Sequence, residues 1–181
     1  MSATAPRRAL VLAHTGRQDA IAAALQAVDM LEDAGLRAVL LDADEAGVRE
    51  LAPGAEDFAP EILGRDCTLA DISIGLVLGG DGSVLRAAEL VRGSQVPLVA
   101  VNLGHVGFLA EAERTDLQHT VEAVAAERYT VDERMALDVV VKVAGRQVAR
   151  TWALNEASVE KSSRERMLEV VVSVDAVSYT H

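Results

Sequence analysis

The sequence of 181 residues is poor in cysteine and in aromatic residues. Its single cysteine, Cys67, excludes an internal disulfide, and no Cys or His partner stands at zinc-ligand spacing around it. We therefore expect Cys67 to act as an inert small apolar residue. Aromatic residues make up 3% of the chain, which leaves the core to Val, Leu, Ile and Ala and provides no platform for stacking nucleic-acid bases.

Positive charge is also scarce. The chain has 17 Lys and Arg against 28 Asp and Glu, and its formal net charge is −11. Nucleic-acid-binding faces concentrate positive charge to release counterions, so we expect no nucleic-acid partner. No apolar run approaches the roughly 20 residues of a membrane-spanning helix, and residues 1–8 lack the apolar core of a signal peptide. We expect a cytoplasmic protein with no membrane partner.

Short apolar runs alternate with helical stripes in the first part of the chain. Runs typical of strands buried on both faces of a parallel sheet occur at 8–14, 37–41, 74–78 and 97–101. Three segments favour helices, one from Asp19 to Gly35, one after the glycines at 79–82, and one from Thr115 or Asp116 to about Ala126. The acidic stretch 42–71 has weak periodicity, and we interpret it as a loop with room for one short helix. This order predicts an α/β fold with a Rossmann-like, mainly parallel sheet.

The pattern changes after residue 130. Strand-like runs at 137–143 and 147–154 flank a short turn, and another run follows at 167–175, so antiparallel strands are expected here. So few strands are marginal for independent stability. We predict an α/β domain over 1–130 and the beginning of an all-β domain over 131–175.

The sharpest motif is the glycine-rich segment 79–83, GGDGS, between a predicted buried strand and a helix. Glycines allow tight turns and close backbone approach, and a helix N-terminus favours phosphate. Asp81 is an acidic residue beside the expected phosphates. Such a residue can act as a general base on a hydroxyl group or as a metal ligand. The Walker pattern is absent, and Leu85 replaces the third glycine of a dinucleotide fingerprint. An ordinary turn with an acidic cap is the alternative.

Two further polar segments follow predicted strands. The segment 102–108 should open at the same sheet edge as GGDGS, and its Phe108 could stack on a flat ring or fill the core. The pair Asn155 and Glu156 could bind ribose hydroxyls or an adenine edge. Arg166 belongs to a small basic group that could meet a polyphosphate or only solvent.

Three segments in this order, LVLGGDGS, NLGHVGFLAE and LNEASVEK, resemble the bacterial NAD kinases. HTGR at 14–17 also fits, and the resemblance extends over about residues 8–175. It implies that ATP or polyphosphate phosphorylates the 2′-hydroxyl of the adenosine ribose in NAD, which makes NADP. It also implies a divalent cation, usually Mg²⁺, and an intact enzyme that is a homodimer or homotetramer.

The resemblance implies roles for particular residues. Asp81 corresponds to the catalytic acid that takes the proton from the ribose 2′-hydroxyl or orients it. No side chain is assigned as a metal ligand. The residues implied in the nucleotide site are Gly80, Gly82, Arg86, Phe108, Asn155, Glu156 and Arg166.

The sequence departs from the family at its end. The family continues with a β-rich half that carries a TPTGSTAY-like motif and completes the NAD site, so we expect little or no activity from this chain by itself. Residues 176–181 do not continue the family pattern. We predict that they are a non-native tail, because one frame of a transposon-adapter sequence encodes Val-Ser-Tyr-Thr-His.

Two other functions remain open on the sequence. A lipid kinase of the same superfamily shares GGDG, although the acidic charge and the lack of a basic amphipathic stretch disfavour a membrane-surface enzyme. A non-catalytic nucleotide-binding module would bind NAD or ATP without turnover.

Sequencing the source locus past codon 175 tests the prediction of a non-native tail. We expect the frame to run on into a TPTGSTAY-like segment, because the resemblance implies a further β-rich half. The prediction of a non-native tail would be contradicted if the genome encoded residues 176–181 directly after residue 175.

Overall fold

The computed structural model describes residues 6–13, 18–51, 59–103, 112–113, 116–154, 156–160, 171–174 and 177–180. The chain divides into two compact units, Met1–Asp132 and Glu133–His181. The first unit contains all the described helices.

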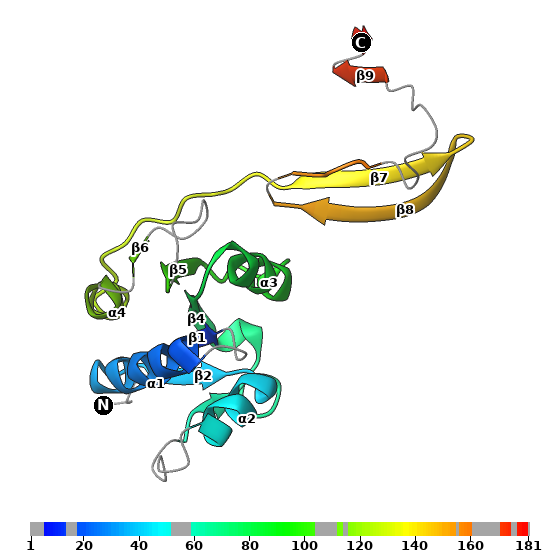
Figure 1. Ribbon diagram of the computed structural model, residues 1–181. Helices are drawn as coiled ribbons and strands as arrows, with labels where there is room; N and C mark the ends of the chain where they lie inside the picture. Colours follow the sequence, from blue (N-terminus) through cyan, green and yellow to red (C-terminus); the bar gives the residue numbers. More distant parts are fainter. Residues whose placement is uncertain are drawn as a thin grey trace. The chain divides into compact units, whose positions relative to one another are not determined.

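A six-stranded parallel sheet forms the centre of the first unit. The strands lie in the order β3-β2-β1-β4-β5-β6 (Figure 1). This arrangement confirms the predicted α/β fold with a mainly parallel sheet. The strands are β1 Arg8–Ala13, β2 Arg37–Leu40, β3 Glu61–Ile62, β4 Ile72–Leu78, β5 Leu98–Asn102 and β6 Ala112–Glu113.

Helices cover both faces of this sheet. Alternate residues of β1 point into two different cores, since Val11 belongs to the cluster with α1 and α4, and Leu10 to the cluster with α3. Figure 1 accordingly shows α3 and α4 on opposite sides of the sheet. Burial on both faces explains why the strands are continuous apolar runs in the sequence. The helices are α1 Gln18–Asp33, α2 Asp42–Leu51, α3 Asp81–Val91 and α4 Leu117–Ala125, with a 3-10 turn at Leu69–Asp71.

The acidic stretch after β2 is more ordered than its sequence indicates. It contains α2, which corresponds to the one short helix that we expected in a loop, and the edge strand β3, which we did not predict. Three acidic residues in the first turn of α2 suit the positive end of its dipole, and Arg49 pairs with Glu45 at 2.8 Å one turn away. Strand β3 has two residues, too few for a periodic signal, and its Glu61 binds Arg8 of β1.

The second unit contains two antiparallel hairpins. Strand β7, Leu137–Val143, pairs with β8, Arg146–Ala153, through a turn in which Ala144 and Gly145 have positive φ. Strand β9, Val171–Val174, pairs with β10, Val177–Thr180. Most of the β7–β8 hairpin is exposed, including the apolar side chains of Val141 and Val148. The antiparallel strands agree with the sequence pattern, while the non-native origin of residues 176–181 stays a prediction.

The turn after β4 should require glycine at position 79. Gly79 has a φ of 155°, and a Cβ there would lie 2.4 Å from Ser83 Oγ and 3.0 Å from Ser83 Cβ. We expect Gly79→Ala to lower the free energy of unfolding by about 1 to 3 kcal/mol. Thermal unfolding measures this effect. Gly80→Ala is the matched control, because Gly80 has a φ of −86° and open space around it. Equal stabilities of the two variants would contradict the prediction.

Candidate nucleotide site at the sheet edge

The carboxyl ends of three strands meet at one edge of the sheet. Ala13 at the end of β1 pairs with Leu78 at the end of β4, and Leu78 pairs with Val101 of β5. The chain goes from β1 to β2 on one side and from β4 to β5 on the other, so the strand order reverses between β1 and β4. Ligands of open α/β sheets bind in the crevice at such a reversal.

The glycine loop begins α3 at this edge. The Gly79 N–H donates to the Val101 carbonyl at 3.0 Å, which extends the sheet pairing into the loop. Gly80 is the N-cap of α3, and its carbonyl accepts from the Ser83 and Val84 N–H groups at 2.9 and 3.2 Å. Among the described residues, no hydrogen bond from a side chain of the N-cap residue caps the start of α3, because Gly80 has no side chain. The first turn of α3 can therefore present backbone N–H groups and the positive helix end to an anion.

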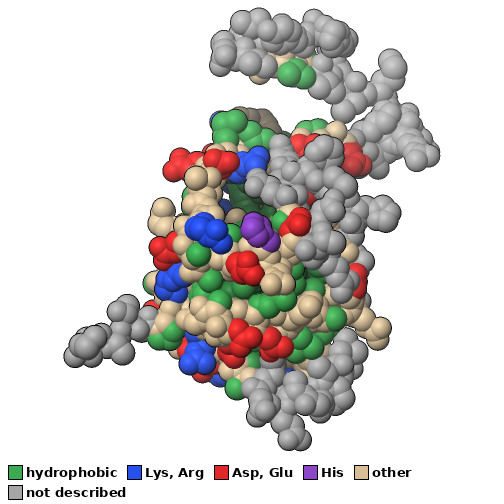
Figure 2. Space-filling view, turned by 90° about the vertical axis from the view of Figure 1, so that its left-hand side faces the viewer, with side chains coloured by type: hydrophobic (Ala, Val, Ile, Leu, Met, Phe, Trp, Pro, Cys, Tyr) green, Lys and Arg blue, Asp and Glu red, His purple; other side chains and the backbone are tan. Residues whose placement is uncertain are grey.

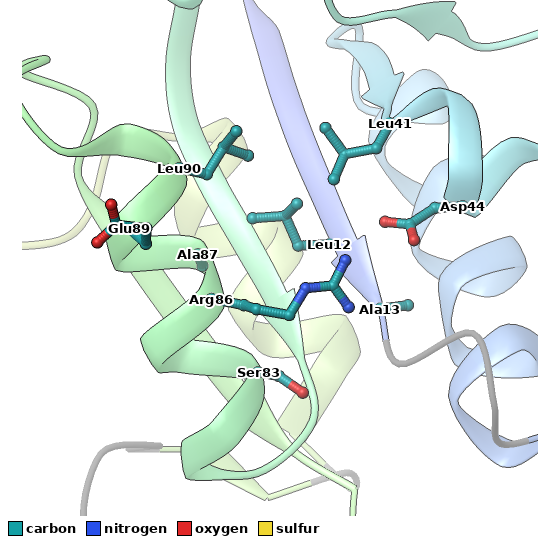
Figure 3. A pocket seen from close by; sticks show the side chains of 9 residues that line it. All are labelled: Leu12, Ala13, Leu41, Asp44, Ser83, Arg86, Ala87, Glu89 and Leu90. Atoms are coloured by element: carbon teal, nitrogen blue, oxygen red, sulfur yellow. The ribbon is translucent and has the colours of Figure 1, made fainter.

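A cavity of about 280 Å³ opens beside this loop. Its residues come from the end of β1, from Leu41 and the start of α2, and from α3, which contributes positions 83, 86, 87, 89 and 90 (Figure 3). Leucine side chains form much of the wall, and the polar groups are few. The lining residues are Leu12, Ala13, Leu41, Asp44, Ser83, Arg86, Ala87, Glu89 and Leu90.

Asp44 is the exceptional group in this cavity. Its side chain is 1% exposed, and neither carboxylate oxygen has a hydrogen-bond partner in the described part of the chain. Figure 3 shows Asp44 and Arg86 pointing toward one another from opposite walls. Burial raises the pKa of the Asp44 carboxyl. The charge of Arg86 and the backbone of Ala13 only partly oppose this rise.

The structure brings part of the predicted site together. Gly80, Asp81, Gly82 and Arg86 lie on one loop and the helix that follows it, with the Asp81 side chain half-buried in the first turn. Glu156 is exposed in a short segment of the second unit. Phe108, Asn155 and Arg166 lie outside the described residues.

Sequence reasoning did not find Asp44. It lay in a stretch interpreted as a loop, and an acid in an acidic segment carries no distinguishing signal. The usable clue was its place shortly after β2, because dinucleotide-binding folds put a ribose-binding acid near the end of their second strand.

Charged side chains of both signs are mixed on the face that Figure 2 shows. Figure 2 shows Lys and Arg side chains scattered among Asp and Glu on one face, without a basic patch among the described residues in that view. None of the helices in the described ranges is long and apolar enough to cross a membrane. Within the same ranges, no group of three or more His, Cys, Asp or Glu side chains could hold a metal ion.

Comparison with known proteins identifies relatives over most of the chain. The model of the ATP-NAD kinase N-terminal domain matches residues 10–129. NAD kinase of Leifsonia xyli subsp. xyli is 49% identical over 172 residues, which are 94% of this chain and 56% of that protein. NAD kinase of Thermobifida fusca is 46% identical over 176 residues, which are 95% of this chain and 54% of that protein. The chain therefore spans about half the length of the curated relatives it matches.

A solved structure supports the fold. Yeast NADH kinase complexed with NADH matches with a TM-score of 0.63 at 19% sequence identity, and the match covers 84% of this chain and 48% of that chain. The predicted fold class is confirmed by this likeness and by the parallel sheet.

Replacing the buried acid should stabilise the fold. We expect Asp44→Asn to raise the free energy of unfolding by about 1 to 2 kcal/mol at pH 8, because it removes a buried charge without a partner. The folded-state pKa of Asp44 is raised, so ionisation lowers stability as the pH rises above about 4. The gain from the variant should therefore shrink as the pH falls toward 4. Thermal unfolding over this range measures it.

Asp42→Asn is the matched control, because Asp42 is exposed in the same helical turn. It should change stability little, or lower it slightly through the helix dipole. A lower stability of Asp44→Asn at pH 8 would mean that the carboxylate has an internal partner.

Proposed function

The chain belongs to the ATP-NAD kinase family, and from this premise we propose that it supplies the phosphate-binding half of an enzyme that phosphorylates the 2′-hydroxyl of the adenosine ribose of NAD. The product is NADP, and the phosphoryl donor is ATP or polyphosphate. The observation that carries the proposal is the place of Asp81, in the first turn of α3 where the strand order reverses. The named relatives favour this activity over a lipid kinase or a non-catalytic module.

Phosphoryl transfer to a hydroxyl requires alignment and charge neutralisation more than covalent chemistry by the protein. The Asp81 carboxylate accepts or orients the proton of the attacking 2′-hydroxyl, which raises the nucleophilicity of its oxygen. The N–H groups of the first turn of α3 bind the phosphate beside it. Arg86, one turn further along the helix, adds positive charge at the neighbouring cavity.

A divalent cation, usually Mg²⁺, would neutralise charge on the transferred phosphate when bound. We propose that the cation would arrive on the nucleotide phosphates, because Mg²⁺ is usually held by substrate phosphates together with one or two carboxylates. The Asp81 carboxylate is a hard oxygen donor at the phosphate-binding loop and suits such a site.

We propose NAD-binding roles for Glu156 and for three residues outside the described ranges, Phe108, Asn155 and Arg166. Asn155 and Glu156 would bind the NAD ribose or adenine through polar groups, Arg166 would meet its phosphates, and Phe108 would stack on a ring. The yeast relative was solved with NADH, which supports a dinucleotide site in this fold. We further propose a cytoplasmic homodimer or homotetramer for the whole enzyme.

Substitution of Asp81 tests the activity. In the protein expressed from the complete reading frame, NADP formed from NAD and ATP is measured with an NADP-specific dehydrogenase. We expect Asp81→Asn to lower kcat by about two to four orders of magnitude, because the hydroxyl loses its base. The affinity for NAD should change little, since Asn keeps the shape of the side chain.

Asp29→Asn in α1 is the control, because Asp29 is exposed and lies outside the sheet edge. It should retain wild-type turnover. Near-normal turnover of Asp81→Asn would remove Asp81 from the catalytic role, and no NADP from the wild type would refute the proposed function.

A further inference from the structure

We infer that the cavity between α2 and α3 binds the nucleoside part of a ribonucleoside triphosphate, with the Asp44 carboxylate accepting hydrogen bonds from the ribose hydroxyls. The inference rests on the proposed function, because it names the donor of the same phosphoryl transfer as a nucleotide. It gives Asp44 a binding role and separates the donor site from the acceptor site.

The first argument is the missing partner of Asp44. A carboxylate that is 1% exposed and has no hydrogen bond in the described part of the chain destabilises the apo protein. The dipole of α2 favours acids at its start, but exposed Asp42 meets that need without being buried. Arg86 acts on the carboxyl through its charge and donates no hydrogen bond to it. A ligand that donates hydrogen bonds would complete the site.

The second argument is the chemistry of the walls. The apolar side chains of Leu12, Leu41 and Leu90 line the cavity together with three polar side chains, which belong to Asp44, Arg86 and Ser83 (Figure 3). Such a lining, mostly apolar with a few placed polar groups, is typical of small-molecule sites. A ribose presents two vicinal O–H donors that match the two acceptors of one carboxylate. A nucleobase presents flat apolar faces that match the leucines.

The third argument is the size of the cavity and the direction in which the phosphates of a bound nucleotide would leave it. The cavity of about 280 Å³ lies near the lower limit of ligand pockets, about 300 Å³, so it suits a nucleoside whose phosphates extend outside. Ser83 and Arg86 line the cavity from the same helix that begins at Asp81, so the cavity extends to the first turn of that helix. A phosphate chain leaving the ribose past Arg86 would reach the first turn of α3, where Asp81 prepares the acceptor hydroxyl.

The position in the fold agrees with this assignment. Asp44 stands in the first turn after β2, which neighbours β1 in the sheet. In dinucleotide-binding folds an acid near the end of the second strand binds ribose hydroxyls. The present site would use the same place in the fold for a triphosphate donor.

The test uses the protein expressed from the complete reading frame, with Asp44→Asn as the variant and Asp42→Asn as its control. Binding of ATP, 2′,3′-dideoxy-ATP and inorganic tripolyphosphate is measured by calorimetry. The wild type and the control should bind ATP about tenfold or more tightly than the dideoxy compound, as expected for hydrogen bonds to a charged group. In Asp44→Asn this preference should disappear, while tripolyphosphate binds all proteins equally.

Steady-state kinetics distinguish donor from acceptor. We expect Asp44→Asn to raise the KM for ATP about tenfold and to leave the KM for NAD unchanged. A raised KM for NAD with an unchanged KM for ATP would place the acceptor in the cavity and overturn the inference. Unchanged binding of ATP would overturn it too.

Thermal unfolding of the same proteins shows whether each variant folds as stably as the wild type. Asp44→Asn should be at least as stable as the wild type without ligand and should gain less stability from ATP, whereas Asp42→Asn should gain as much as the wild type. Failure of the proposed function has a different result from failure of this inference. In that case the wild type would form no NADP, whether or not it prefers ATP to 2′,3′-dideoxy-ATP.

Discussion

The alignment of strand ends at one edge of the parallel sheet is the constraint on which the candidate site depends. The pairing of Ala13 with Leu78, and of Leu78 with Val101, fixes where the segments after β1, β4 and β5 leave the sheet. A slip by one residue would turn every side chain of a strand to the opposite face, so the two buried cores hold this register. The glycine loop is thereby held at the reversal of strand order, and α3 begins at this edge.

The burial of Asp44 at this edge lowers the stability of the fold and serves the proposed binding of a ligand. Proteins bury carboxylates where a partner or a ligand compensates for lost hydration, and functional sites are where local rules of stability are broken. The apolar walls that exclude water from Asp44 also strengthen any hydrogen bond it makes with a ligand. The same burial therefore lowers the stability of the empty protein and favours binding in the cavity.

Much of the fold could be predicted because buried strands and amphipathic helices leave strong periodic signals. The limits of β7 were predicted to the residue, and those of β1 and β5 to within a residue at each end. In the region after β2 one short helix was expected within a loop, but its bounds were not predicted, because α2 is stabilised by end charges and an ion pair rather than by a long apolar stripe. Strand β3 pairs with β2, its Glu61 contacts Arg8 and its Ile62 is buried in the core, so it depends on residues far away in the sequence.

The sequence by itself determined the alternation of elements, the glycine loop with Asp81 and the family, because local periodicity and motif order are properties of neighbouring residues. Only the tertiary structure decided which side chains share the cavity. Leu12, Asp44 and Arg86 come from three different elements, and the sheet order brings them together. The burial of Asp44 likewise depends on packing around it, since nothing in its neighbours along the chain distinguishes it from the exposed Asp42.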